Sequence, residues 1–100
     1  MVLSPTPPER MLDSRGRPYF LWDCAMTLQR FEELLRGSDP ETHAYLVGKL
    51  MRQAKPDDVF TFVRLDEIAA AWPCIVRHLG RTRAFWTWWL ADQWKVIPRP

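Results

Sequence analysis

Apolar residues recur every three or four positions over much of this chain, which is the spacing of amphipathic α-helices. The first such helix is predicted from Thr27 to Gly37. Thr27 is a suitable N-cap, and glycine is typical of the position just after a helix end. One face of this helix is apolar and is predicted to be buried; it consists of Leu28, Phe31, Leu34 and Leu35.

A second, longer helix is predicted from Ser38 to about Ala54. Ser38 and Glu41 are three residues apart, which is the spacing of a capping box. Gly48 lies on nearly the same side as the apolar residues of this helix, so we expect a neighbouring helix to approach closely there. Those apolar residues are Leu46, Val47, Leu50, Met51 and Ala54.

Shorter helices are predicted to follow, and each begins with acidic residues. Asp57 or Asp58 would cap a helix through Val63. Asp66 would cap the next helix, and Pro73 would end it. Acidic side chains at a helix start complement the helix dipole, so we interpret these residues as caps and not as metal ligands or acid–base catalysts.

The last predicted helix, Arg83 to Trp94, follows Thr82 as its N-cap and holds four of the six tryptophans. Successive helical residues are turned by about 100°, so its rings spread over more than half of the circumference. A surface helix needs an apolar stripe of only about 100°. Either the excess rings pack beneath the other helices and the N-terminal arm, or part of them contacts another protein.

The region before the first helix has no helical period. Residues 1–16 are rich in proline and predict a flexible tail. The segment Arg17–Asp23 contains four consecutive large apolar residues and predicts an extended arm whose rings insert between helices, with Asp23 as a cap or ion-pair partner. The fold class is therefore predicted to be all-α: a small bundle of about five helices preceded by an extended N-terminal arm, with one helical domain over residues 17–97.

Composition bounds the function classes. The 100 residues are 47% hydrophobic, which suits one small folded domain. The net charge of +2 gives no strong attraction to nucleic acid or to a membrane surface. Basic side chains outnumber acidic ones only toward the C-terminus, where the cluster consists of Arg77, Arg81, Arg83, Lys95 and Arg99.

The cysteine count and the apolar runs bear on localisation. Cys24 and Cys74 are too few for a disulfide framework. The chain start lacks the pattern of a secretory signal, and no apolar stretch reaches the roughly 18 residues that span a bilayer. We therefore expect a cytoplasmic protein with free thiols and no membrane segment.

Motifs for catalysis, metals and cofactors are absent from the sequence. The four glycines are isolated, so no phosphate-binding loop is formed. Cys74 and His78 are four residues apart but lack a third, orienting group, and a zinc site would lack any CxxC or HxxxH element. We expect a protein that is not an enzyme and has no cofactor and no metal site.

Two binding hypotheses are left. Tryptophan and arginine are the usual anchors of protein interfaces. In the first hypothesis the chain binds a partner protein, with self-association when expressed alone, through Trp88, Trp94 and Phe62, with Arg81 and Arg83 at the rim. In the alternative it is a DNA- or RNA-binding regulator that uses the C-terminal basic face, namely Arg77, Arg81 and Arg83.

The segment Pro18-Tyr19-Phe20-Leu21-Trp22-Asp23 resembles a family of small bacterial helical proteins that contain an uncharacterised Pro-Tyr-Phe-Leu-Trp-Asp domain. The resemblance continues through the following helices and covers residues 17–75. Members of that family are commonly encoded beside nucleotidyltransferase toxins of the abortive-infection type. The resemblance therefore implies an antitoxin-like protein with such a toxin as its partner. Cys24-Ala25-Met26 departs from the family, whose members have an acidic or aromatic residue soon after Trp-Asp.

Overall fold

The computed structural model describes residues 3–98, which form an all-α fold, as predicted, without any β-strand among them. It has more and shorter helices than predicted. The α-helices are α1 (Pro8–Met11), α2 (Leu28–Leu35), α3 (Pro40–Gln53), α4 (Pro56–Phe62), α5 (Leu65–Ala70), α6 (Trp72–Ile75) and α7 (Arg83–Trp88). The 3₁₀ segments are η1 (Tyr19–Leu21), η2 (Val76–His78) and η3 (Gly80–Thr82), and the π-helical segment η4 (Trp89–Gln93) continues α7.

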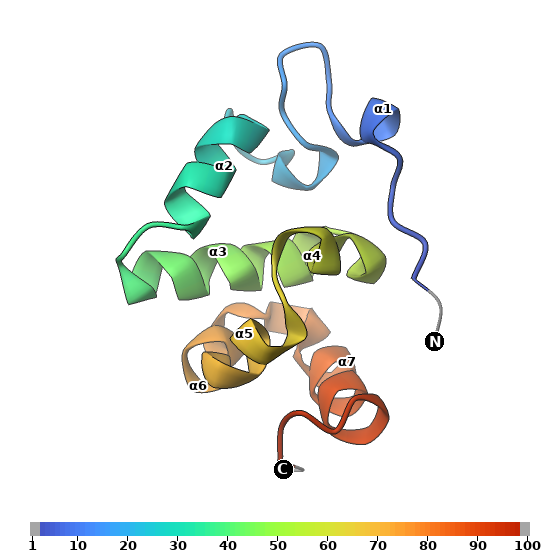
Figure 1. Cartoon of the computed structure of the whole chain (residues 1–100), viewed down its shortest axis with the longest axis vertical. Coiled ribbons are helices and arrows are strands. Elements are labelled where there is room, and N and C mark those ends of the chain that lie inside the picture. Colours follow the sequence, from blue (N-terminus) through green and yellow to red (C-terminus); the bar gives the residue numbers. More distant parts are fainter. Residues whose placement is uncertain (1–2, 99–100) are drawn as a thin grey trace.

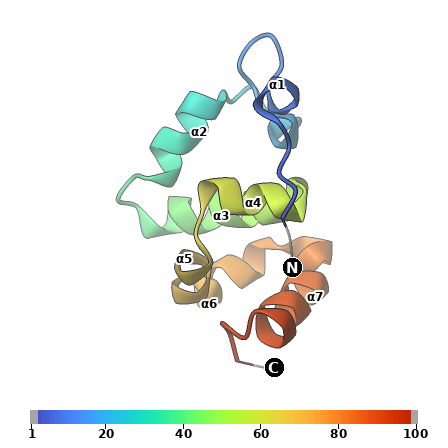
Figure 2. The same ribbon diagram turned by 45° about the vertical axis from the view of Figure 1, so that its right-hand side comes forward.

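Helix α3 is the central helix of the domain. It crosses the middle of the molecule, with α2 and the N-terminal region on one side and α5, α6 and α7 on the other (Figure 1). The same order is seen after a 45° turn (Figure 2), so α2 and α7 lie at opposite ends of the molecule. Because both sides pack on α3, six consecutive residues of it are buried, namely Leu46, Val47, Gly48, Lys49, Leu50 and Met51.

The predicted close approach at Gly48 is confirmed, and the neighbour is η2. A Cβ atom built on Gly48 would lie 2.5 Å from the Cβ of His78. Real Cβ contacts are not that short, so only glycine allows η2 to lie where it does. Arg52 fastens the same contact one turn later, because its guanidinium donates a 2.7 Å hydrogen bond to the carbonyl of His78.

The long helices begin close to the predicted positions. Thr27 caps α2, since its hydroxyl accepts from the backbone N–H of Arg30 at 3.2 Å. For α3 the prediction of Ser38 as the cap was wrong by one residue. Asp39 takes this place and accepts from the N–H of Glu41, because Pro40 supplies the first helical residue.

The starts of the short helices differ from the predictions. Asp66 pairs with the guanidinium of Arg64 at 2.7 Å, and Glu67 instead accepts from the backbone N–H of Arg64 at the start of α5. Pro73 does not end a helix but lies in the first turn of α6, where its missing N–H costs nothing. The hydroxyl of Thr82 donates to a carbonyl of the preceding turn and does not cap α7.

The C-terminal helix changes type partway along. After Trp88 the backbone widens into the π-helical segment η4, in which the N–H of Trp94 donates to the carbonyl of Trp89 at 3.0 Å. The helix then ends at Lys95, which has a positive φ of 56°. A left-handed residue in this position is a common helix stop, and it turns the chain so that Ile97 returns to the core.

Residues 3–16, expected to be a flexible tail, contact the domain. They contain the short helix α1, whose Met11 is buried, and the two residues that precede them lie outside the described part. The contact depends on the paired aspartates that were interpreted as caps of α4. The carboxylate of Asp57 accepts from the N–H of Ser4 at 2.7 Å instead.

Asp58 is the centre of this contact and is fully buried. Its carboxylate accepts from the N–H and the hydroxyl of Thr6, each at 2.6 Å, and from the hydroxyl of Tyr19. Burial alone would raise the pKa of Asp58, but the hydrogen bonds from Thr6 and Tyr19 outweigh it and hold that pKa below its ordinary value. Burial, together with the bond to Asp58, raises the pKa of Tyr19 to about 12.

The arm Arg17–Asp23 buries Phe20 and Leu21 as predicted, but it forms a 3₁₀ turn and not an extended segment, and it leaves Trp22 exposed. Phe20 is fully buried, with its ring centroid 5.5 Å from those of Phe31 and Phe62. The predicted ion pair of Asp23 is present, because its carboxylate lies 2.6 Å from the ammonium of Lys49.

Gly48→Ala tests the close approach of η2. Alanine gains about 1 kcal/mol over glycine in a helix interior, whereas overpacking of a fixed contact costs about 1–3 kcal/mol. Because the Cβ of His78 is held by the backbone, we expect the overpacking cost to exceed the gain, so that the free energy of unfolding falls by about 1–2 kcal/mol in a denaturant titration. The control is Gln29→Ala, at an exposed position of α2. A stabilised Gly48→Ala protein would contradict the close contact.

Asp58→Asn tests the buried carboxylate. Loss of charge-assisted hydrogen bonds should lower the free energy of unfolding at neutral pH by about 2 kcal/mol. The folded-state pKa lies below the unfolded value of about 3.9, so the stability that Asp58 contributes is present above that value and is lost as pH falls through the folded pKa. The wild type should therefore lose more stability than Asp58→Asn on acidification. As a control, Asp57→Asn should change the free energy of unfolding little, because its hydrogen bond is exposed. Parallel curves of stability against pH for the wild type and Asp58→Asn would refute this role of Asp58.

Candidate interaction surface

The aromatic residues of α7 and η4 divide into an inner and an outer set. Trp86 and Trp89 are 1% and 3% exposed. The indole N–H of Trp86 donates to the carbonyl of Met51 in α3 at 2.9 Å, which fixes the rotation of the helix. In that rotation Phe85 and Trp88 are directed outward, and they are 41% and 48% exposed. Not all of the rings can be covered by the domain itself.

A concave surface runs along the outer side of this helix. We call it the α7 groove; it has an open volume of about 680 Å³. Half of the residues that line it are small or short, which leaves space beside the helix between the larger side chains. The α7 groove is lined by Gly80, Arg81, Arg83, Ala84, Thr87, Trp88, Ala91 and Asp92.

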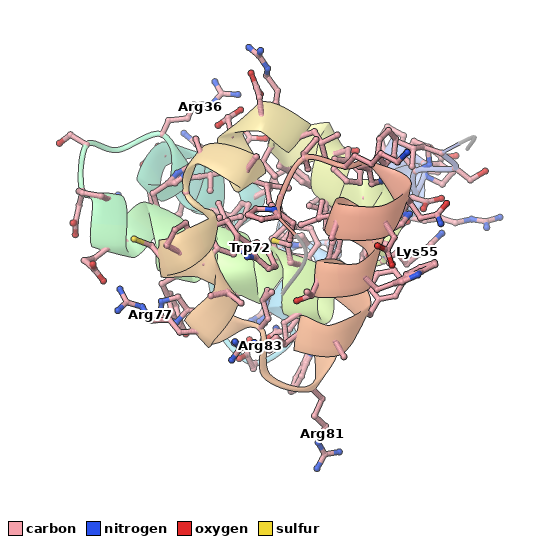
Figure 3. All side chains as sticks on the ribbon, turned by 90° about the horizontal axis from the view of Figure 1, so that it is seen from below. Arg36, Lys55, Trp72, Arg77, Arg81 and Arg83 are labelled. Atoms are coloured by element: carbon pink, nitrogen blue, oxygen red, sulfur yellow. The ribbon has the colours of Figure 1, made fainter. Side chains whose placement is uncertain are left out.

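Positive charge is exposed at the η3 end of the α7 groove. Figure 3 shows Arg77, Arg83 and Arg81 along one edge of the molecule, with Arg81 projecting away from its body. Arg77 is paired with Glu41 at 2.8 Å, which offsets its charge. No carboxylate of residues 3–98 pairs with Arg81 or Arg83. Of the predicted basic cluster, Arg99 lies outside the described residues.

The structure thus brings Trp88, Arg81 and Arg83 together, but it places the other two candidates elsewhere. Trp94 is half-buried, because its ring packs against Phe60 and Trp89 with centroids 6.0 Å away in each case. Phe62 is half-buried in the aromatic cluster around Phe20 and lines a separate hollow beside Arg36, Arg64 and His43. Neither residue lines the α7 groove.

Three exposed aromatic residues were not among the candidates, namely Trp22, Tyr45 and Phe85. Phe85 is the outer neighbour of Trp88, with ring centroids 6.2 Å apart. Trp22 is 75% exposed and lies between the buried Leu21 and the ion-paired Asp23. Helical spacing turns Phe85 only about 40° from the buried Trp89, and its ring centroid lies 5.4 Å from those of Trp86 and Trp89. The pattern therefore gives no signal that Phe85 is exposed. Nothing in the pattern of the arm distinguishes Trp22 from its buried neighbours.

Other features of the surface concern metals, thiols and membranes. No group of three or more His, Cys, Asp or Glu side chains in the described range is arranged to hold a metal ion. Cys24 is half-buried and Cys74 is exposed, and both are free thiols. Within residues 3–98 there is no helix with the length and apolar character needed to cross a bilayer.

A scan against protein-family models, a search of curated proteins and a search of solved structures each found no match to this chain.

The division into inner and outer rings predicts different effects of truncation. Trp89→Ala should lower the free energy of unfolding by about 3–5 kcal/mol, because it opens a cavity in the core. Trp88→Ala should lower it less, by about 1–2 kcal/mol, because half of that side chain is already in water. Chemical denaturation of both variants measures this. Equal losses of stability would show that Trp88 is a core residue.

Proposed function

We propose that this chain is a non-enzymatic interaction protein that binds another protein through the α7 groove. The observation that carries the proposal is the exposure of Trp88 in one groove with two arginines, Arg81 and Arg83, that have no carboxylate partner within the described part of the chain. Exposed aromatic and arginine side chains in one concave surface are the composition of interface hot spots.

The energetics favour covering this surface. Burial of the exposed half of the Trp88 side chain would contribute about 3 kcal/mol from apolar area alone. Arg81 and Arg83 lie where they can form ion pairs with a partner without first breaking an ion pair within the described chain. Binding would therefore gain apolar burial at Trp88 and charge-assisted hydrogen bonds at its rim.

The resemblance of Pro18–Asp23 supplies a class of partner. We propose that the chain is antitoxin-like and binds a nucleotidyltransferase toxin, which it would inhibit by masking. In this proposal the Pro18–Asp23 segment has a mainly structural role. Phe20 and Leu21 enter the core, Tyr19 binds Asp58 and Asp23 binds Lys49.

A nucleic-acid-binding regulator is the second candidate. Arg81 and Arg83 beside the exposed ring of Trp88 would suit a single strand, in which phosphates contact guanidinium groups and a base stacks on indole. The ion pair of Arg77 with Glu41 weakens the case for nucleic-acid binding. Of the three arginines predicted to contact nucleic acid, only Arg81 and Arg83 then have no acidic partner in the described chain. Binding to a labelled oligonucleotide that falls steeply with salt and fails in Arg81→Ala/Arg83→Ala would support it.

The proposed function is tested by co-expression of the full chain with a nucleotidyltransferase toxin from the same genome. The toxin should co-purify with the wild-type chain and lose its effect on cell growth. Trp88→Ala combined with Arg81→Ala should weaken the complex at least tenfold, whereas Trp22→Ala, at the other large exposed indole, should leave it unchanged. No complex with the toxin, or a complex that is insensitive to the α7 groove variants, would contradict the proposal.

A further inference from the structure

We propose that the occupant of the α7 groove is an amphipathic helix of the partner, with carboxylates next to its apolar face. This inference rests on the proposed function and names the structural element that the groove receives. It follows from the shape of the groove and from the position of its charges.

The shape of the groove suits a helix. Ala84, Thr87 and Ala91 recur at the four- and three-residue spacing of one helix face, and Gly80 continues that row before α7. A row of small residues leaves a furrow between larger ones, into which the side chains of a second helix pack. The exposed ring of Trp88 forms one side of the furrow. A peptide that binds by β-strand addition would need a sheet edge to pair with, and residues 3–98 contain no β-strand.

The positive charges at the groove determine which charge the partner helix must carry. Arg81 and Arg83 stand at the start of α7, and Trp88 follows five residues after Arg83, at a distance along the helix axis of roughly 7 Å. A partner helix with a carboxylate at position i and apolar residues at i+4 and i+7 would meet the arginines and the indole together. A basic helix would bring like charges together at Arg81 and Arg83.

The test uses two synthetic 16-residue helical peptides with the same leucine face, one with glutamates and one with lysines beside that face. Fluorescence anisotropy measures the binding of each labelled peptide to the full chain. We expect the glutamate peptide to bind at least tenfold more tightly than the lysine peptide. Arg81→Ala/Arg83→Ala should abolish that difference, because it removes the charges that discriminate between the peptides.

Two variants test the furrow itself. Ala84 is exposed, so Ala84→Arg should fold normally, as circular dichroism would show, while its side chain obstructs the furrow. Ala84→Arg and Trp88→Ala should each weaken the binding of the glutamate peptide at least tenfold. The matched control is Trp22→Ala, because Trp22 is an exposed tryptophan outside the α7 groove, and it should bind the peptide as the wild type does.

Other outcomes overturn the inference. Equal affinity for both peptides, or binding that survives Ala84→Arg, would show that the groove does not select an acidic helix. Sedimentation that reveals a dimer disrupted by Ala84→Arg would assign the groove to a second copy of the chain. If the peptide fails to bind while capture of the toxin still depends on Trp88, the inference of a helical occupant is refuted and the proposed function stands. If toxin capture fails as well, the proposed function is contradicted.

Discussion

The period of the α-helix is the constraint on which the surface of this protein depends. Residues three apart share a face, and residues two apart are turned by about 200°. Trp86 and Trp89 therefore enter the core together, and Trp88, two residues after Trp86, is turned toward solvent. Phe85 lies at the border of the two faces, against both buried indoles. With the indole of Trp86 bonded to the carbonyl of Met51, the helix cannot rotate to exchange the two sets without breaking a buried hydrogen bond.

That bond is effective because α3 is itself held on every side. Gly48 brings η2 within contact of α3, and the chain that follows η2 leads through Gly80 into α7. On the opposite side, the ion pair of Asp23 with Lys49 ties the arm to the same helix. The buried carboxylate of Asp58 then fastens the first residues to α4. The position of the α7 groove is thus a consequence of contacts made to α3, while its recognition chemistry comes from residues 80–92.

Several of the correct predictions have a cause that is local in sequence. Thr27 caps a helix three residues away, and a glycine on an apolar helix face permits close packing whatever the neighbour is. The aspartates before α4 were misinterpreted because their partners lie far away in the sequence: Thr6 is 52 residues from Asp58. Of the candidate site, Trp88 and the two arginines fall together because they are close in sequence: Arg81 lies in η3, and Arg83 and Trp88 lie in α7, which follows it directly.

Other parts of the candidate site depended on packing that no local pattern specifies. Trp94 has the same chemistry as Trp88, but the π-helical turn before it places its ring on Phe60. Phe62 lies in α4, and its ring packs against Phe20 of the N-terminal arm. Trp22 is outside the core because the 3₁₀ turn ends at Leu21, and an extended arm would have alternated its side chains differently.

The most direct test of this account is the solvent exposure of each indole. Fluorine NMR of the full chain labelled with 5-fluorotryptophan, assigned by single Trp→Phe variants, reports exposure as the shift of each resonance between H₂O and D₂O. We expect large solvent shifts for Trp22 and Trp88 and almost none for Trp86 and Trp89. A resonance of Trp88 that is as insensitive to solvent as that of Trp89 would refute the division into buried and exposed rings.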